Sequence, residues 1–177
     1  TSDYASADYY YVNKSSLPKV YGGFNTSLSW KGFDLSAIFA YSIGGYIYNR
    51  DITMILHNGS LEGRAWSTEI LRRWTPDNRY TDVPALSTTS NNWNSASTRF
   101  LQNNSYMRLK NLTLSYNLPK PWVSKLALSS VQVYVQGDNL FTIHKNQGLD
   151  PEQGITGITY YRYPAMRTIS GGINIAF

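Results

Sequence analysis

The stretch from residue 20 to residue 43 restricts the fold most strongly, because a single strand register sorts its side chains into two faces. Two runs of about eleven residues flank Lys31-Gly32, a two-residue turn ending in glycine of the kind that joins antiparallel strands. A slip of one residue would exchange the two faces, so the pattern specifies the pairing. We therefore predict a hairpin with one apolar and one polar face. Its apolar pairs are Trp30 with Phe33, Leu28 with Leu35, Thr26 with Ala37, and Phe24 with Phe39.

The length of these two strands favours a membrane-spanning hairpin. At about 3.3 Å per residue and a tilt of about 45°, eleven residues cover about 25 Å, the height of the apolar band of an outer-membrane barrel. Strands of soluble sandwiches more often have about 5–6 residues. Trp30 and Phe33 end the apolar face at the turn and Tyr41 lies near its other end, which are the positions of aromatic girdles.

The last strand, expected at 167–177, alternates between apolar and small or polar residues and stops on an aromatic. It resembles the C-terminal assembly signal of bacterial outer-membrane barrels, and Ile173, Ile175 and Phe177 would carry that signal. Taken alone, the same pattern also suits an edge strand of a soluble β-sandwich.

Composition supports a barrel wall and excludes several other classes. Charged residues make up 15% of the chain, below the roughly 25% that is usual for soluble domains. There is no cysteine, so disulfides and thiolate metal sites are excluded. The net charge of +5 comes from scattered basic residues, which is not a nucleic-acid footprint. The start has neither an initiator methionine nor a signal peptide, so we expect part of a longer protein.

The remaining pattern predicts an all-β antiparallel segment of about five strands with connections of alternating length. Connections of 2, 62, about 12 and 25 residues separate the strands, as periplasmic turns and extracellular loops alternate in such barrels. The long ones, 44–105 and 142–166, are thus expected outside the cell, with the C-terminus periplasmic. Five strands cannot close a barrel, so further strands are required. The expected strands are 20–30, 33–43, 106–118, 131–141 and 167–177.

Two local features complete this pattern. A short helix is expected over 61–74, capped by Ser60, with Trp66 and Trp74 on one face. In strand 106–118, Arg108 and Lys110 fall at apolar-face positions, which we interpret as the strand leaving the membrane for water.

An ordered set of motifs resembles the C-terminal part of the SusC/RagA-type TonB-dependent transporters. The motifs are 17–24 (LPKVYGGF), 30–36 (WKGFDLS), 73–76 (RWTP), 105–119 (SYMRLKNLTLSYNLP), 137–142 (GDNLFT), 148–152 (GLDPE) and the last strand. The resemblance implies the last strands of a 22-stranded barrel with an N-terminal plug, driven by the TonB complex and lidded by a SusD-like surface lipoprotein. It implies oligosaccharide or peptide cargo. The plug lies outside this chain.

The candidate contact residues are four aromatics in or beside the loops: Trp66, Trp74, Trp93 and Tyr106. Their faces suit stacking on sugar rings or packing on a partner protein. The alternative is that Trp66 and Trp74 form the small core of the loop itself, which leaves Trp93 as the stronger candidate.

No pattern of catalytic residues is present, and we expect neither an enzyme nor a cofactor. His57 and His144 lie in expected loops without a second ligand at metal spacing, and we expect them to be solvated. Asp150 and Glu152 are too few to hold a cation and are expected to order their loop. Arg108 and Lys110 are expected either to bind lipopolysaccharide phosphates or to remain solvated.

Two functions follow from the sequence: part of an outer-membrane transporter, or a soluble β-sandwich that binds carbohydrate. The apolar strand residues distinguish them, because a sandwich buries these side chains whereas a barrel wall turns them outward. The residues are Phe24, Leu28, Phe39, Leu114, Val133 and Ile173.

Overall fold

The computed structural model describes residues 3–59, 61–87, 89 and 92–177. The chain forms two compact units. The first comprises residues up to Leu17 together with Tyr46–Asn103 and Gln153–Arg162, and the second comprises Pro18–Gly45, Asn104–Glu152 and Tyr163–Phe177. Ser60, the expected helix cap, lies outside the described residues.

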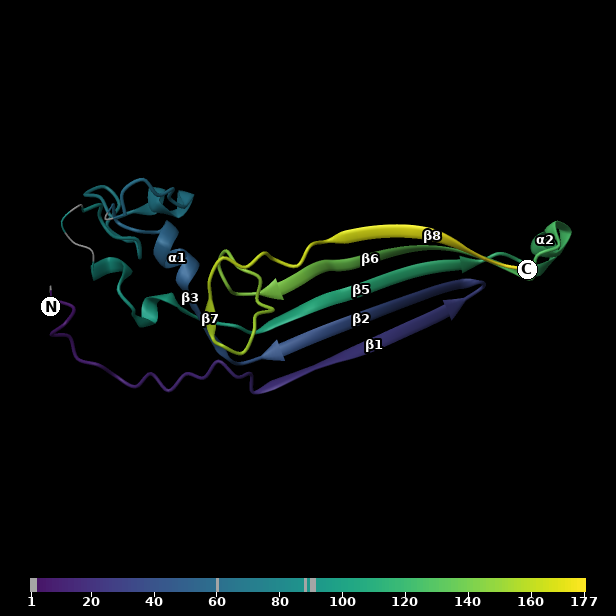
Figure 1. Ribbon diagram of the computed structural model, residues 1–177, viewed down its shortest axis with the longest axis horizontal. Coiled ribbons are helices and arrows are strands. Elements are labelled where there is room, and N and C mark those ends of the chain that lie inside the picture. Colours follow the sequence, from purple (N-terminus) through teal and green to yellow (C-terminus); the bar gives the residue numbers. More distant parts are fainter. Residues whose placement is uncertain (1–2, 60, 88, 90–91) are drawn as a thin grey trace. The chain divides into compact units, whose positions relative to one another are not determined.

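The second unit is built on a five-stranded antiparallel sheet with the order β1-β2-β5-β6-β8 (Figure 1). The register across the first hairpin is the expected one, with Trp30 opposite Phe33 and Phe24 opposite Phe39, so this prediction is confirmed. A short helix α2 (Lys120–Val123) and a 3₁₀ turn η4 (Ser124–Leu126) connect β5 to β6. The strands are β1 (Val20–Trp30), β2 (Phe33–Ile43), β5 (Tyr106–Asn117), β6 (Ser130–His144) and β8 (Thr168–Ala176).

The hairpin turn depends on two residues with left-handed backbone conformations. Lys31 has a φ of 47° and Gly32 a φ of 88°, the pattern of the turns whose twist matches that of the strands they join. A Cβ atom on Gly32 would lie 3.1 Å from the carbonyl oxygen of Asn117. Glycine is thus required here both for its backbone and for the space it leaves.

Replacing Gly32 with valine is expected to destabilise the hairpin by about 1–3 kcal/mol, the range for a β-branched residue held in an unfavourable region. The measurement is the urea midpoint of the folded protein in detergent. Lys31→Asn is the matched control, since asparagine tolerates positive φ, and it should leave the midpoint unchanged or raise it. Equal midpoints for the two variants would contradict the requirement for glycine.

A β-bulge corrects the placement of Arg108 on the apolar face of β5. The registers of β5 with β2 and with β6 both shift between Leu109 and Asn111. Lys110 is the extra residue, so the side chains before it change face. Arg108 therefore pairs with Thr142 on the polar face, whereas Leu109 pairs with Phe39 on the apolar face.

The two faces of the sheet differ in chemistry. Many large side chains of the apolar face are exposed: Leu28 is 66% and Ile173 is 62% accessible. The polar face carries cross-strand hydrogen bonds, such as Asn111 Nδ2 to Asp138 Oδ1 at 2.7 Å and Asn174 Nδ2 to Gln132 Oε1 at 3.1 Å. This pattern suits a sheet with lipid on one side and water on the other.

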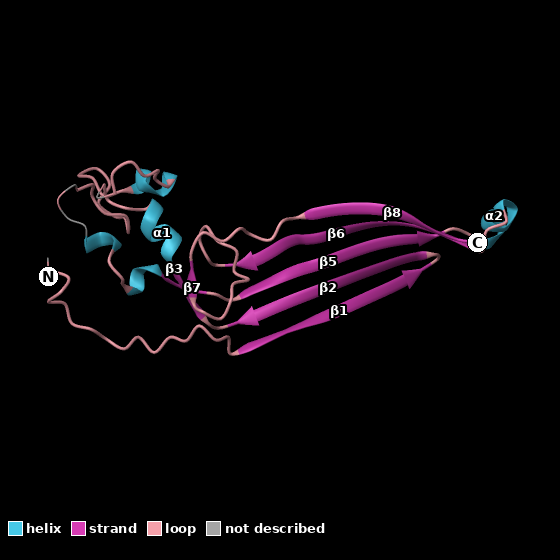
Figure 2. Cartoon of the chain, in the orientation of Figure 1, coloured by secondary structure: helices cyan, strands magenta, loops and turns pink. Residues whose placement is uncertain are grey.

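The first unit is built from short strands, a short helix and 3₁₀ turns joined by loops (Figure 2). Its three-stranded sheet has the order β4-β3-β7, with β3 at Tyr46–Asn49, β4 at Leu101–Asn103 and β7 at Ile158–Thr159. Helix α1 (Arg50–Ile55) begins at the cap Asn49. The buried apolar side chains are Ile47, Ile70, Val83 and Phe100. Two further 3₁₀ turns are η2 (Asn92–Asn94) and η3 (Thr98–Phe100).

The expected helix over 61–74 is wrong in extent and type. The structure has only a 3₁₀ turn, η1 (Thr68–Arg72), capped by the hydroxyl of Ser67. Trp66 and Trp74 lie outside it, so they share no helical face. Trp74 is instead held against another loop, because its backbone N–H donates to the carbonyl of Val83 at 2.7 Å.

Among the residues the structure describes, no helix is long and apolar enough to cross a lipid bilayer.

Candidate functional site

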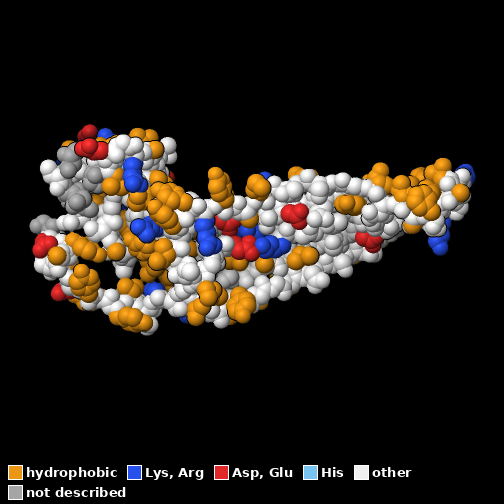
Figure 3. All heavy atoms as spheres, in the orientation of Figure 1, with side chains coloured by type: hydrophobic (Ala, Val, Ile, Leu, Met, Phe, Trp, Pro, Cys, Tyr) orange, Lys and Arg blue, Asp and Glu red, His pale blue; other side chains and the backbone are white. Residues whose placement is uncertain are grey.

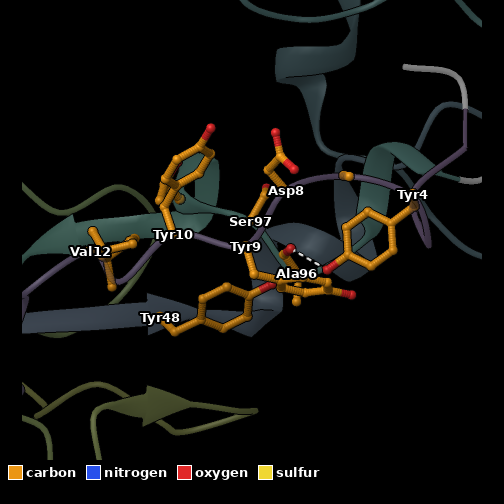
Figure 4. Close-up of a pocket in the computed structure, with 11 residues that line it drawn as sticks. Tyr4, Asp8, Tyr9, Tyr10, Val12, Tyr48, Ala96 and Ser97 are labelled. Atoms are coloured by element: carbon orange, nitrogen blue, oxygen red, sulfur yellow. Dashed lines mark hydrogen bonds between the residues drawn. The ribbon is translucent and has the colours of Figure 1, made fainter.

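The first unit contains a cavity of about 490 Å³ with four tyrosines in its wall (Figure 4). Tyr4 and Tyr9 come from the N-terminal segment and Tyr48 comes from β3, and the three side chains converge near Ala96 in Figure 4. The Tyr4 hydroxyl donates to the carbonyl of Ala96 at 2.6 Å, which ties the segment to the 96–101 wall. Asp8 is the one charged side chain among the lining residues.

A second cavity of about 390 Å³ shares Tyr48 and Ala96 with the first and adds Arg50 and Asn94. The buried side-chain amide of Asn94 makes no hydrogen bond within the described part of the chain. Aromatic faces beside a free amide form a surface that can stack on a flat apolar group and hydrogen-bond to a polar one. The expected contact residues did not include this surface. The run Tyr9-Tyr10-Tyr11 was the available signal in the sequence.

Trp66 is engaged within its own loop, with the buried His57 as partner. The indole N–H donates to His57 Nδ1 at 3.0 Å, and the two rings meet edge to face at 5.2 Å. Backbone N–H groups of Gly59 and Leu61 also donate to this nitrogen, at 3.3 and 3.4 Å. Burial disfavours the charged imidazolium and lowers the pKa of His57. His57 is therefore a neutral core acceptor, which corrects the expectation of a solvated loop histidine.

Trp93 is packed beneath a charged side chain. The Arg99 guanidinium lies 4.2 Å from the centre of its ring, a cation–π contact. The buried indole N–H makes no hydrogen bond among the described residues. Trp93 and Trp66 belong to the first unit and Tyr106, the first residue of β5, belongs to the second. The predicted contact residues thus do not form one site within either unit.

A loop clamp at the start of β5 brings four charged side chains together in the second unit. Arg108 uses three nitrogens: Nη2 donates to Asp150 Oδ1 at 2.5 Å, Nη1 to Glu152 Oε2 at 2.7 Å, and Nε to Thr142 Oγ1 at 2.8 Å. Lys110 Nζ donates to Glu152 Oε1 at 2.6 Å. Arg108 is only 3% exposed. These basic groups therefore hold the loop and are not solvated charges, and the structure supports the loop-ordering role of the two carboxylates.

The carboxylate of Asp150 joins three parts of the second unit. Besides Arg108, it accepts hydrogen bonds from the N–H groups of Ala165 at 2.7 Å and Glu152 at 2.8 Å. Burial alone would raise the pKa of Asp150, but these two N–H groups and the guanidinium outweigh it and hold the pKa below its ordinary value. The clamp thus contains an ionised aspartate at neutral pH.

This lowered pKa predicts how the clamp responds to acid. The Asp150 carboxylate binds its proton more tightly in the unfolded chain than in the folded one. The stabilisation that ionised Asp150 gives the clamp is therefore complete above the ordinary pKa of aspartate, and it is lost as the pH falls through the pKa of Asp150 in the folded chain. Protection of the 148–165 backbone from hydrogen exchange, corrected for intrinsic rates, should stay constant from about pH 8 to 5 and fall only in stronger acid. Asp150→Asn should lack this acid-dependent loss. A loss near pH 6 in the wild type would contradict the assignment.

The described residues contain no cluster of three or more His, Cys, Asp or Glu side chains able to hold a metal ion.

Comparisons with known proteins place the chain among membrane receptors. It is 37% identical to TonB-dependent receptor P3 and 31% identical to TonB-dependent receptor P26, both of Formosa agariphila, over 88% and 97% of its length. It is 27% identical to TonB-dependent receptor SusC of Bacteroides thetaiotaomicron over 94% of its length. The chain spans 16–18% of the length of these relatives. No family model matches it.

Solved structures agree with the sequence relatives. The RagAB peptide transporter superposes with a TM-score of 0.80 at 36% identity, and the RagAB peptide importer in its closed-closed state superposes with a TM-score of 0.79 at 36% identity. Each match covers 94% of this chain and 18% of the matched chain. The relatives are receptors and transporters of the outer membrane. The chain therefore belongs to the SusC/RagA-type TonB-dependent receptors and corresponds to part of their length.

Proposed function

We propose that this chain forms the C-terminal wall strands and two extracellular loops of an outer-membrane transporter that imports oligosaccharides or peptides. The other strands of a barrel of about 22 strands would close on β1 and β8. The plug, and the TonB complex acting through it, belong to the part of the protein outside this chain. A SusD-like surface lipoprotein would cover the extracellular side.

The observation that carries this proposal is the five-stranded sheet with an exposed apolar face and two open edges. Phe24, Leu114 and Val133 are exposed, although they sit in long regular strands. Within the described residues, β1 pairs only with β2, and β8 only with β6. An uncovered apolar face and unpaired edges are stable when lipid meets the face and further strands meet the edges.

The connections give the sheet a direction in the membrane. Lys31-Gly32 and the α2–η4 connector lie at the end of the sheet where Phe177 follows β8, as the pairing of Ser130 with Ala176 requires. In outer-membrane barrels the short turns are periplasmic and the long loops extracellular. We therefore assign Phe177 to the periplasmic rim, and 44–105 and 142–166 to the cell exterior.

Cargo contact is assigned to the loop surfaces of the first unit. The cavity at Tyr4, Tyr9 and Tyr48 and the neighbouring amide of Asn94 combine aromatic faces with a hydrogen-bonding group. Such surfaces suit both glycans and peptides. Trp93 remains a candidate for partner contact through the half-exposed part of its side chain.

The soluble carbohydrate-binding sandwich is less well supported. A sandwich stabilises its sheet by burying one face against another, but Leu28, Leu114 and Ile173 are exposed.

Single cysteines on neighbouring strand positions test the proposal in the complete transporter. Leu28→Cys, Leu114→Cys and Ile173→Cys report on the apolar face, and Ser27→Cys, Thr113→Cys and Asn174→Cys are the matched polar-face controls. Each cysteine receives a fluorophore, and the protein is reconstituted in vesicles that contain lipid spin-labelled on its acyl chains. We expect strong quenching for the first set and weak quenching for the second. Equal quenching, or the reverse order, would reject the barrel-wall orientation.

A further inference from the structure

The sheet end that carries the short connections combines an aromatic rim with exposed lysines. Trp30 and Phe33 flank the hairpin turn, and the ring of Phe33 lies 4.5 Å from that of Tyr116 on β5. All three share the apolar face through the strand register. Aromatic side chains at strand ends sit at the boundary between hydrocarbon and headgroups. This row therefore marks the depth at which the bilayer interior ends.

The connector between β5 and β6 extends beyond that row. Its start is set by two hydrogen bonds, from Asn117 N–H to Gly32 O at 2.8 Å and from Leu118 N–H to Val131 O at 2.9 Å. Trp122 and Leu126 are 62% and 68% exposed, while Val123 is buried and anchors the short helix. Apolar side chains gather at this end of the sheet, with lysine or arginine beside them (Figure 3). The connector thus presents apolar groups at headgroup depth.

The charged side chains of the hairpin turn and of the connector are all basic. Lys31, Lys120 and Lys125 are exposed, and none of them forms an ion pair with the described residues. Segments 20–33, 118–132 and 168–177 contain no Asp or Glu. Asp34 is the nearest carboxylate in sequence, and it accepts hydrogen bonds from Ser29 Oγ at 2.5 Å and Asn117 Nδ2 at 2.7 Å on the polar face.

We infer that the rim formed by Lys31, Lys120, Trp122, Lys125 and Leu126 binds anionic phospholipid headgroups of the membrane leaflet at that end. This inference rests on the proposed function, because it needs the sheet to span a membrane. Trp122 and Leu126 enter the interface, and the three ammonium groups meet lipid phosphates. A basic residue near an anionic surface contributes about 1 kcal/mol, roughly a fivefold preference for each lysine.

A label at Ser124, which is exposed in the connector, tests this inference in the complete transporter. Ser124→Cys carries a fluorophore in phosphatidylcholine vesicles that contain a trace of headgroup-spin-labelled phosphatidylglycerol or, separately, phosphatidylcholine. We expect several-fold stronger quenching by phosphatidylglycerol. Changing Lys31, Lys120 and Lys125 together to glutamine should equalise the two lipids, whereas changing all three to arginine should preserve the preference.

The outcomes separate this inference from the proposed function. Equal quenching by both lipids in the wild type, or a preference that survives the glutamine changes, would overturn lipid binding by these lysines. A label at Ser124 that neither lipid quenches, together with a Leu28→Cys label that acyl-chain-labelled lipid quenches, would show that another part of the protein covers the connector. Loss of quenching at Leu28 as well would reject the membrane-spanning sheet itself.

Discussion

Arg108→Met is expected to destabilise the loop that follows β6 by about 3–5 kcal/mol, the range for removing one partner of a buried ion pair. The loss arises because Asp150 would remain buried and ionised without its guanidinium. Glu152 would keep Lys110, and Thr142 would lose its donor. Hydrogen exchange of the 148–165 backbone in the complete transporter measures the local opening free energy.

Two controls isolate the buried charge. Arg72→Met removes an arginine whose ion pairs with Glu69 and Asp82 are exposed, so it should cost about 1 kcal/mol or less. Arg108→Met combined with Asp150→Leu removes both buried charges and should recover part of the loss. A single Arg108→Met variant with unchanged protection would show that the pair does not hold the loop.

Phe177→Ala is expected to lower assembly into the outer membrane several-fold while leaving the strand pairing of the chain intact. Phe177 is 93% exposed, so its removal takes away little packing within this chain. Its expected role lies in recognition by the assembly machinery, together with Ile173 and Ile175 on the apolar face of β8. The folded fraction is read from heat-modifiable migration of the membrane-extracted protein on gels.

The control for this change is Met166→Ala, which removes another strongly exposed apolar side chain, 80% accessible, just before the last strand. It should leave the folded fraction unchanged, and Phe177→Tyr should retain most of it because the aromatic ring remains. Equal folded fractions for wild type and Phe177→Ala would reject the signal function of this residue.

The sheet was the part of the fold that could be predicted best from the sequence, because the alternation of apolar and polar side chains along a strand is a local signal. The first hairpin could be registered from residues 20–43 alone, since one register satisfies both faces at once. β6, by contrast, runs from Ser130 to His144, beyond the expected 131–141. The strand continues past the irregular pairing at Asn139, which has a φ of 52°, because Thr142, Ile143 and His144 pair with β5.

The loop unit could be predicted much less well. The spacing of four between Trp66, Ile70 and Trp74 suggested a helix, but contacts between distant segments outweighed that local preference. The indole of Trp66 hydrogen-bonds to His57, and the backbone N–H of Trp74 hydrogen-bonds to the carbonyl of Val83. The tyrosine cavity combines the N-terminal segment with β3 and residues 96–101. No periodicity within one segment indicates such a meeting.

The sequence by itself determined that this chain makes long two-faced strands, because the alternation of side chains follows from backbone geometry and needs no other part of the molecule. The motif order was also sufficient to indicate the family. Only the tertiary structure decided where the charges lie. The bulge at Lys110 turns Arg108 to the polar face, where Asp150 and Glu152 meet it from a loop about 40 residues later. Whether a strand bulges depends on how it pairs with its neighbouring strands, and the ion pair depends on a loop that is distant in sequence. Neither can be predicted from the local sequence pattern.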